Sequence, residues 1–417
     1  MKQIKIKGKN KLTGTIRISG AKNAAVALIP AAILSDEEVT ICNVPEISDI
    51  NSLEEILKYL GVKFSRATES IIINAKDMTN KEIPEDISRK LRASYYFMGA
   101  LLSKYKKVEM YFPGGCNIGS RPINLHLDGF KKLGATIIEE NDKYTIEAKK
   151  LVGTKIDLEL ASVGATINII LAATKAKGIT TITNAACEPE IKNVCDLLNS
   201  MGAKITGAGT STIKIKGVSK LKKGYVEVIP DRIEAGTYII IGSLIGENLK
   251  IDNIIPEHLE ALTTKLIESN ANIEIGRDYV LTSASQELKS VDVETYYFPG
   301  FPTDLQQPFS VYLTQAKGVS TLKETIYENR FMHIPYLNRM GANIKIDGGK
   351  LKIKGKTPLE GKMVTSTDLR GGAAMIVAGL IAKGTTTIND VEHILRGYEG
   401  IVEKLSLVGA KIEIREI

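Results

Sequence analysis

The sequence predicts an α/β protein of two similar domains, each built from three βαβαβ-type units around buried helices. A short pattern at the end of a helix recurs six times, with its glycine or asparagine at positions 61, 134, 202, 270, 341 and 409. The copies lie about 70 residues apart, which is a repeat length of one supersecondary unit. Glycine or asparagine at this point is typical of a left-handed helix C-cap. The copies read LGVK (60–63), LGAT (133–136), MGAK (201–204), SNAN (269–272), MGAN (340–343) and VGAK (408–411).

Two strand signatures recur within these units. One is rich in threonine and isoleucine and ends in asparagine, at residues 38–43, 178–184 and 384–389. The other reads IKIKG at residues 4–8 and 213–217, and LKIKG at 351–355. The first residues of the chain therefore supply a strand that belongs to a unit completed elsewhere. Because the chain also ends on a strand, at residues 410–415, we expect both ends in one domain.

Each unit contains two kinds of helix. Residues 52–60 and 402–408 are amphipathic, whereas residues 24–34, 167–173, 238–245 and 373–382 are apolar nearly all round. A helix without a polar face is buried, so the apolar helices should lie inside the domains with the sheets around them.

Composition limits the possible functions. The 417 residues are 43% hydrophobic and 25% charged, as in soluble globular proteins, and no apolar run is long enough to span a membrane. The first residues alternate like a strand, so we expect a cytoplasmic protein. Four cysteines without a CxxC pair and four histidines predict neither a metal site nor disulfides. The net charge of +7, with scattered lysines and 6% aromatic residues, fits a small anionic substrate better than nucleic acid.

The most distinctive stretch is the loop FPGGCNIGSRPINLH at residues 112–126. It joins a strand, residues 107–112, to a helix that should begin near Asn124. Glycine-rich backbone can approach a ligand closely, and a thiol beside cationic groups is favoured as thiolate. Cys116 and Arg121 are therefore candidates for chemistry, the alternative being a structural turn with a small buried cysteine.

Cations stand where buried helices begin, which the helix dipole disfavours unless an anion binds there. Lys22, Arg92 and Arg370 occupy such positions. Together with Arg121, Arg330 and Arg396 they predict a cleft for a strongly anionic phosphate or carboxylate ligand. Asp231 and Asp368 are interpreted as helix caps or structural partners. Neither a P-loop nor a dinucleotide-binding fingerprint is present, so ATP and NAD are not expected.

These motifs resemble the UDP-N-acetylglucosamine 1-carboxyvinyltransferase family, and the resemblance covers essentially the whole chain. It is carried by SGAKN (19–23), the loop 112–122, SVGAT (162–166), FPTDLQ (301–306), ENRFMHIP (328–335) and RGYE (396–399). The resemblance implies the enolpyruvyl transferase fold, two inside-out α/β domains of three repeats each. It places one domain at residues 22–229 and the other, discontinuous, at residues 1–21 and 230–417.

The resemblance implies a reaction as well. The family transfers the enolpyruvyl group of phosphoenolpyruvate to the 3′-hydroxyl of UDP-N-acetylglucosamine and releases phosphate, the first committed step of peptidoglycan precursor synthesis. The epoxide fosfomycin inhibits it. The implied partners are these two substrates, without nucleic acid, membrane, metal or cofactor, and the sequence does not indicate the oligomeric state.

By the same resemblance, Cys116 is the general acid toward the enolpyruvyl methylene and Asp304 is the base for the sugar hydroxyl. Phosphoenolpyruvate is bound by Lys22, Asn23, Arg121, Arg330, Arg370 and Arg396. The UDP-sugar is bound by Arg92, Arg121, Pro122, Ile123, Asn124, Leu125, Ser162, Val163, Gly164, Asp304 and Ile326. The chain departs from many members at Asn124, where they carry Asp, and from some at Leu160, where they carry Lys.

Two alternatives remain open at this point. A shikimate-pathway enolpyruvyl transferase would share the anion clamp and the architecture, although the cysteine loop and the RPINL run favour the UDP-sugar enzyme. A basic repeat protein that binds nucleic acid without catalysis would hold polyanions with a steep salt dependence and ignore UDP-sugars.

Overall fold

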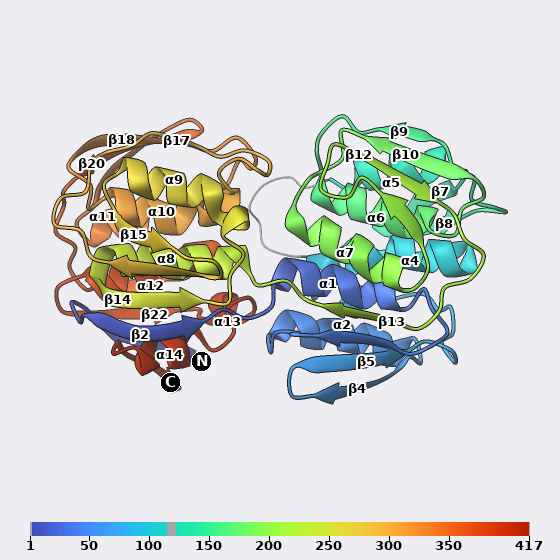
Figure 1. The fold of residues 1–417 in the computed structure, drawn as a ribbon, viewed down its shortest axis with the longest axis horizontal. Helices are drawn as coiled ribbons and strands as arrows, with labels where there is room; N and C mark the ends of the chain where they lie inside the picture. The colour runs from blue at the N-terminus through green and yellow to red at the C-terminus, as the bar shows by residue number, and fades with distance from the viewer. Residues whose placement is uncertain (1, 115–121, 417) are drawn as a thin grey trace. The chain divides into compact units, whose positions relative to one another are not determined.

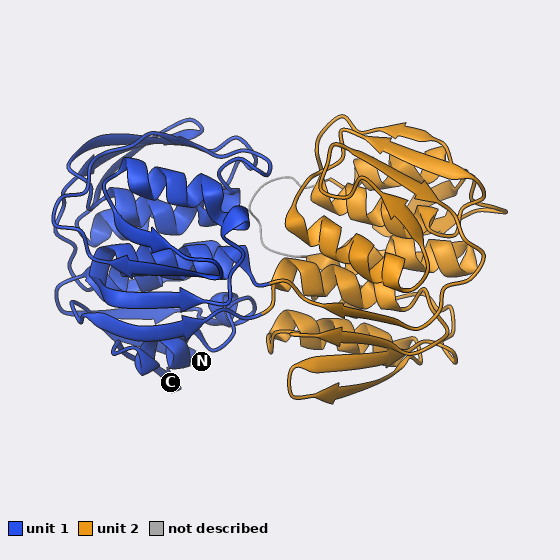
Figure 2. Ribbon diagram, viewed as in Figure 1, with its two compact units in different colours: residues 1–19, 117–120, 230–417 blue, residues 20–116, 121–229 orange. Residues whose placement is uncertain are grey.

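The computed structural model describes residues 2–114 and 122–416, which form two compact units. Unit 1 contains residues 2–19 and 230–416, and unit 2 contains residues 20–114 and 122–229 (Figure 2). The chain thus starts in unit 1, builds unit 2 and returns to unit 1.

Unit 2 alternates helices and strands along the chain. Its helices are α1 (Lys22–Ala32), α2 (Ser48–Tyr59), α3 (Glu85–Ser88), the 3₁₀ helix η1 (Arg92–Tyr95), α4 (Tyr96–Tyr105), α5 (Asn124–Lys132), α6 (Val163–Ala173) and α7 (Pro189–Ser200). Its strands are β3 (Val39–Cys42), β4 (Lys63–Ala67), β5 (Ser70–Asn74), β6 (Lys107–Tyr111), β7 (Thr136–Glu140), β8 (Lys143–Glu147), β9 (Lys155–Asp157), β10 (Ile179–Thr183), β11 (Lys204–Thr206), β12 (Thr212–Lys216) and β13 (Gly224–Glu227). The helix predicted to begin near Asn124 is confirmed as α5.

Unit 1 repeats the same alternation. Its helices are α8 (Arg232–Ile245), η2 (Pro256–Leu259), α9 (Glu260–Glu268), η3 (Thr303–Leu305), α10 (Gln306–Leu313), α11 (Ile334–Arg339), α12 (Leu369–Ile381), α13 (Glu392–Leu395) and α14 (Ile401–Leu407). Its strands are β1 (Lys2–Lys7), β2 (Leu12–Arg17), β14 (Gly246–Asp252), β15 (Asn272–Ile275), β16 (Tyr279–Ser283), β17 (Val293–Glu294), β18 (Gly318–Lys323), β19 (Asn343–Asp347), β20 (Lys350–Gly355), β21 (Met363–Thr365), β22 (Thr385–Asn389) and β23 (Lys411–Glu416).

The four-stranded sheets share one topology, and a three-stranded sheet lacks the parallel edge strand. Unit 1 contains the strand orders β21-β22-β1-β23, β15-β16-β14-β2 and β17-β18-β20-β19, and unit 2 contains β11-β12-β10-β9, β13-β3-β5-β4 and β6-β8-β7. In each four-stranded sheet an edge strand pairs in parallel with its neighbour, and the remaining pairs are antiparallel. The predicted repeat is therefore confirmed as one sheet per copy.

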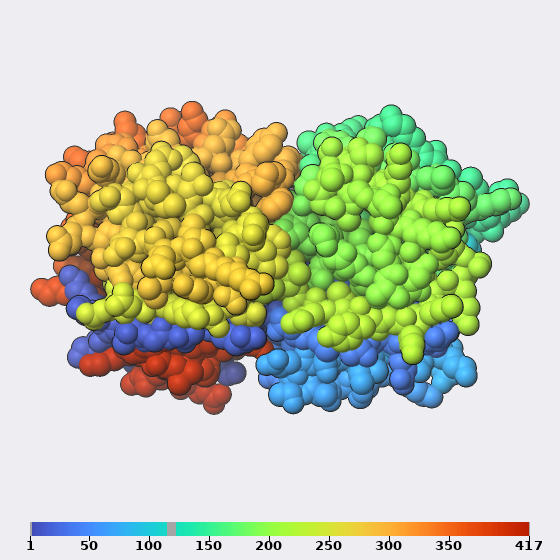
Figure 3. Space-filling model, in the orientation of Figure 1, coloured from blue at the N-terminus to red at the C-terminus, as the bar shows by residue number. Residues whose placement is uncertain are grey.

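The two ends of the described chain lie in unit 1, in agreement with the expectation that they share a domain, and they belong to one sheet. Strand β1 lies between β22 and β23, with Lys2 opposite Glu416. Strand β2 joins another sheet of unit 1 as the parallel neighbour of β14. In Figure 3 the N-terminal residues, in blue, lie between the yellow-green residues of β14 and the red C-terminal residues.

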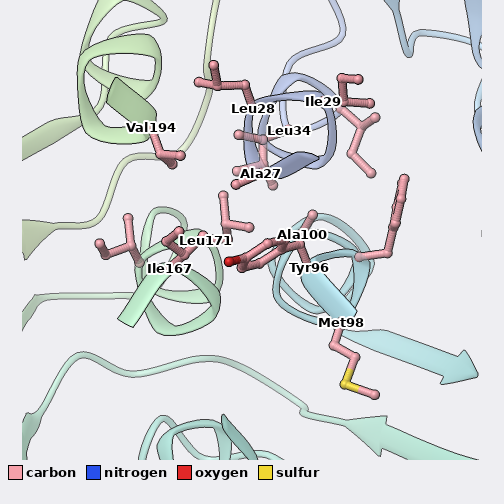
Figure 4. Packing of buried hydrophobic residues seen from close by; sticks show 14 of the residues in the cluster. Ala27, Leu28, Ile29, Leu34, Tyr96, Met98, Ala100, Ile167, Leu171 and Val194 are labelled. Carbon is pink, nitrogen blue, oxygen red and sulfur yellow. The ribbon is translucent and has the colours of Figure 1, made fainter. Parts of the chain in front are cut away.

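Helices fill the centre of each unit and the sheets lie around them (Figure 1). Helices α4 and α6 pack against each other inside unit 2, as do α10 and α12 inside unit 1. Side chains of α1, α4, α6 and α7 meet in the core shown in Figure 4, for example Leu28, Tyr96 and Leu171. Nearly every residue of α6 and α12 is buried, which confirms that the apolar helices are internal.

The predicted helix ends are also confirmed. The residues at 61, 134, 202, 270, 341 and 409 all have a positive φ, between 67° and 109°. Asp231 accepts hydrogen bonds from the Ile233 and Glu234 amides, and Asp368 accepts them from the Arg370 and Gly371 amides, so both cap helices. Among residues 2–114 and 122–416, none of the helices combines the length and apolarity that a membrane span requires.

Candidate active site

Asp304, Arg330 and Arg370 form a largely buried ion-pair triad in unit 1. Arg330 Nη2 lies 2.7 Å from Asp304 Oδ1, and Arg370 Nη2 lies 3.1 Å from Asp304 Oδ2. Each arginine side chain is only 4% exposed, whereas that of Asp304 is 25% exposed. The carboxylate is thus the most accessible part of the triad, and both of its oxygens are taken by guanidinium groups.

Short elements bring the triad together. Asp304 lies in η3, directly before the central helix α10. Arg370 is the second residue of α12, where the Asp368 side chain caps its amide. Its guanidinium lies 5.3 Å from the Tyr398 ring centre, and the Tyr398 hydroxyl is hydrogen-bonded to Thr237 at 3.0 Å. Packing against the aromatic face of Tyr398 fixes the orientation of the Arg370 guanidinium group.

The triad also sets the acidity of Asp304. Burial alone would raise the pKa of this carboxyl, but Arg370 and Arg330 outweigh burial and hold the pKa well below its usual range. Asp304 is therefore ionised at neutral pH, and while both arginines remain on it the carboxylate is a weak base. An anion that engages the arginines would restore its basicity.

In unit 2, two predicted ligand-binding residues start helix α1. Lys22 is its first residue, and its ammonium lies 2.6 Å from Asp49 Oδ2 of α2, with both side chains largely buried. Asn23 follows on the same helix. The expectation that cations at helix starts are balanced by a bound anion is therefore incomplete, because Asp49 and Asp304 already face Lys22 and Arg370.

A second cluster in unit 2 surrounds Arg92. Its guanidinium lies 5.9 Å from the Tyr95 ring centre and 5.8 Å from that of Phe112. His126 packs edge-on against Tyr95 with ring centres 4.8 Å apart. A Cβ at Gly164 would come within 2.8 Å of the Tyr95 hydroxyl and 2.9 Å of His126 Cε1, so a larger residue there would displace these side chains. The structure thereby brings Arg92 together with the start of α6 and the first turn of α5.

Asn168 orients His126. Its Nδ2 lies 2.8 Å from His126 Nδ1, so in this arrangement the ring nitrogen accepts and Nε2 carries the hydrogen. The same amide accepts from the Gly99 N–H of α4 at 3.0 Å and donates to the Tyr95 carbonyl of η1 at 3.1 Å. Sequence reasoning missed both residues, although a single polar residue inside the apolar run 167–173 was a usable signal.

The other predicted residues are placed as follows. Ser162 caps α6 through the Ala165 amide at 3.3 Å, and Val163 is the first residue of that helix. Ile123 is buried, Leu125 is half-buried, and Pro122, Asn124 and Leu160 are exposed. Ile326 follows β18 in unit 1, and Arg396 is the C-cap of α13. Cys116 and Arg121 lie outside the described residues. The described part of the chain contains no group of side chains arranged to hold a metal ion.

Two buried histidines predict a pH dependence of stability. Burial and the nearby Arg92 lower the pKa of His126 to about 3, and burial lowers that of His333 to about 4 despite Asp368. In the unfolded chain histidine titrates near 6.5, so this stability is fully present above about pH 6.5 and is lost as pH falls toward 4 and 3. We expect the free energy of unfolding to fall by up to about 1.4 kcal/mol per pH unit for each histidine.

Urea unfolding followed at several pH values between 7 and 5 measures this slope. The variant His333→Gln should unfold with a slope smaller by roughly one proton. A free energy of unfolding that stays constant over this range would show that neither histidine is held neutral by the fold.

Comparison with known proteins identifies the class to which this fold and site belong. The family model described as EPSP synthase (3-phosphoshikimate 1-carboxyvinyltransferase) matches residues 6–405. The chain belongs to this family of carboxyvinyl transferases, and it is an enolpyruvyl transferase.

Within the family, the chain is similar to proteins named UDP-N-acetylglucosamine 1-carboxyvinyltransferase 2. The one from Geobacillus kaustophilus is 50% identical over 412 residues, which cover 99% of this chain and 96% of the relative. The one from Listeria monocytogenes is 49% identical over 407 residues, 98% of this chain and 96% of the relative. The resemblance predicted from the sequence motifs is thereby confirmed.

Solved structures confirm the predicted fold. The enolpyruvyl transferase NikO from Streptomyces tendae superposes with a TM-score of 0.89 at 26% identity and covers 99% of both chains. The EPSP synthase from Acinetobacter baumannii superposes with a TM-score of 0.77 at 19% identity over 100% of both chains, which shows the shared fold alone.

Proposed function

We propose that this chain transfers the enolpyruvyl group of phosphoenolpyruvate to the 3′-hydroxyl of UDP-N-acetylglucosamine and releases phosphate. One observation carries the proposal: relatives with about half of their residues identical, over 98–99% of this chain, bear the name of that transferase. The triad in unit 1 supplies the charge that such a reaction needs, because phosphoenolpyruvate carries both a phosphate and a carboxylate.

In the proposed mechanism Asp304 takes the proton of the sugar hydroxyl. Arg330 and Arg370 bind the phosphate or carboxylate of phosphoenolpyruvate and leave Asp304 as they do so. When the arginines leave, the carboxylate of Asp304 becomes more basic, and this happens only when phosphoenolpyruvate is bound. The buried guanidinium groups then stabilise the tetrahedral addition intermediate, whose phosphate and carboxylate share one carbon.

The remaining assignments complete the proposal. Lys22, Asn23, Arg121 and Arg396 contribute to phosphoenolpyruvate binding, and Cys116 donates a proton to its methylene carbon in the addition. In the elimination that carbon loses a proton, the C–O bond to phosphate breaks and the double bond forms again. The UDP-sugar is bound by Arg92, residues 121–125, residues 162–164 and Ile326. The proposed domains are residues 22–229 and, in the other, residues 1–21 and 230–417. The cytoplasm, where nucleotide sugar and phosphoenolpyruvate are made, is the proposed location.

A phosphate-release assay tests the proposal. With phosphoenolpyruvate and UDP-N-acetylglucosamine together we expect continuous release of phosphate, and with phosphoenolpyruvate alone we expect none. A parallel reaction contains 3-phosphoshikimate as acceptor, because the family model bears the name of that transferase. Release that requires 3-phosphoshikimate, and not the UDP-sugar, would contradict the proposed acceptor.

A further inference from the structure

We infer that Glu324 is a positioning residue, which holds the segment of Asp304 and the segment of Ile326 and Arg330 to each other within unit 1. Neither the family motifs quoted above nor the charge pattern of the sequence points to this residue. The inference rests on the proposed function, since it explains how the base and its arginine partner are kept in place.

The Glu324 side chain is a buried carboxylate that accepts four hydrogen bonds. The residue is 7% exposed. Its Oε1 accepts from the Thr295 hydroxyl at 3.0 Å and from the Ile326 and Tyr327 amides at 2.8 and 3.2 Å. Its Oε2 accepts from the Thr303 hydroxyl at 2.9 Å. A buried carboxylate is tolerated only when its oxygens are satisfied in this way.

These donors belong to the two segments that carry the ion-pair triad. Thr303 immediately precedes Asp304 in η3. The Tyr327 ring centre lies 4.9 Å from the Arg330 guanidinium, whose Nη2 is 2.7 Å from Asp304 Oδ1. One carboxylate therefore holds the Thr303 hydroxyl beside Asp304 and the Ile326 and Tyr327 amides of the segment that leads to Arg330.

The internal repeats show that the fold itself does not require a glutamate here. In three other copies the residue after the equivalent strand is an asparagine with positive φ: Asn43 after β3, Asn184 after β10 and Asn253 after β14. Each asparagine amide donates to a backbone carbonyl that follows the parallel edge strand, at 2.7–2.8 Å. These contacts close the end of a sheet.

The copy that carries Asp304 differs from this pattern. Glu324 directly follows β18, and its side chain is longer and accepts hydrogen bonds where the asparagines donate one. Its partner Thr295 follows the parallel edge strand β17. In the other copies the partners occupy the same position, since Val228 follows β13, Leu158 follows β9 and Ile18 follows β2. A contact to the residue after the edge strand is thus kept, with the Thr295 hydroxyl as donor in place of a backbone carbonyl as acceptor, and contacts to Thr303, Ile326 and Tyr327 are added. The addition occurs where the chain carries the predicted base, which favours a role in the site over a role in the fold.

Removal of the carboxylate should misplace the reacting groups. In Glu324→Ala four donors lose their acceptor, so the Thr303 and Ile326 segments are free to move apart. A displacement of about 1 Å at a catalytic group costs about 100-fold in rate. We expect kcat to fall about 100-fold and KM for the UDP-sugar to rise, because Ile326 moves with its segment. Glu324→Gln keeps an acceptor oxygen for the two amides, and we expect it to recover most of the activity.

The control is Asn253→Gly, which removes the asparagine contact at the equivalent position of a neighbouring copy and suits its positive φ of 61°. It should lower the melting temperature while kcat, measured well below that temperature, stays near that of the wild type. A double-mutant cycle of Glu324→Ala with Thr303→Val distinguishes a specific link between the two residues from a general loss of stability. If Glu324 acts through Thr303, the two losses in kcat are not additive.

The outcomes separate the two proposals. A wild-type protein that releases no phosphate with both substrates overturns the proposed function and this inference together. An active wild type with unchanged kcat in Glu324→Ala overturns the inference alone, as do equal losses of kcat in Glu324→Ala and Asn253→Gly. If Glu324→Ala does not fold, the single variant Thr303→Val decides, because unchanged kcat there removes the link from Glu324 to Asp304.

Discussion

Replacement of Asp304 with alanine is expected to lower kcat by roughly 10²–10⁴-fold, the usual contribution of a positioned general base. The UDP-sugar should still bind, because the substitution keeps the other residues proposed to bind it, Arg92, residues 122–125 and residues 162–164 of unit 2 and Ile326 of unit 1. The substitution also leaves the buried Arg330 and Arg370 without their carboxylate, which costs about 3–5 kcal/mol of stability. Inorganic phosphate should therefore raise the melting temperature of Asp304→Ala more than that of the wild type.

The chain offers a matched control for this experiment. Asp252 is another carboxylate of unit 1 that is 25% exposed and lies near two cations, Lys250 at 2.8 Å and Arg17 at 3.8 Å. It ends β14 and has no part in the proposed site. Asp252→Ala should turn over like the wild type. Near wild-type turnover of Asp304→Ala, measured by phosphate release, would exclude the proton-abstraction role.

Fosfomycin is expected to inactivate the protein by alkylating Cys116 alone. The thiolate would attack an epoxide carbon, so that a C–S bond forms, the C–O bond breaks and the alkoxide takes a proton. The phosphonate of the drug resembles the phosphate of phosphoenolpyruvate, and the cations proposed to bind that substrate would attract it.

The other cysteines are poor competitors. Burial raises the pKa of the Cys195 thiol to about 12, and burial and Glu188 raise that of Cys187. Cys42 is half-buried at the end of β3. Peptide mass mapping after treatment identifies the labelled residue, and Cys116→Asp, which keeps an acidic group but is a poor nucleophile, should retain some activity and resist the drug. A label on Cys195, or equal inhibition of the aspartate variant, would remove Cys116 from the proposed site.

The architecture could be predicted in detail because the chain contains internal repeats that can be compared with one another. Six copies of one helix end reveal a period that a single copy would not, and the IKIKG run at residues 4–8 places β1 in a sheet completed by the last strand. Helices α6 and α12 have apolar residues on all sides, which predicts that both helices are buried. These signals are local in sequence, and local patterns determine secondary structure and burial.

The site was predicted as separate residues and not as an arrangement. Asp304 and Arg370 were each predicted from motifs, but they are 66 positions apart and their ion pair depends on how η3 meets α12. Asp49 opposite Lys22 was missed for the same reason. Glu324 was missed because a glutamate after a strand is an ordinary surface residue by pattern. Only the fold shows that it is buried with four donors.

The order of the strands also has a consequence for synthesis on the ribosome. Unit 2 is continuous in sequence, apart from residues 115–121 that are not described, and β13 closes its sheet with β3 soon after residue 227 is translated. Strand β1, by contrast, pairs with β22 and β23, so it waits for residues 385–416. At 5–20 residues per second this delay is roughly 20–80 s. During that time β1 is an unpaired strand that invites aggregation, and nascent chains should need a chaperone most at this stage.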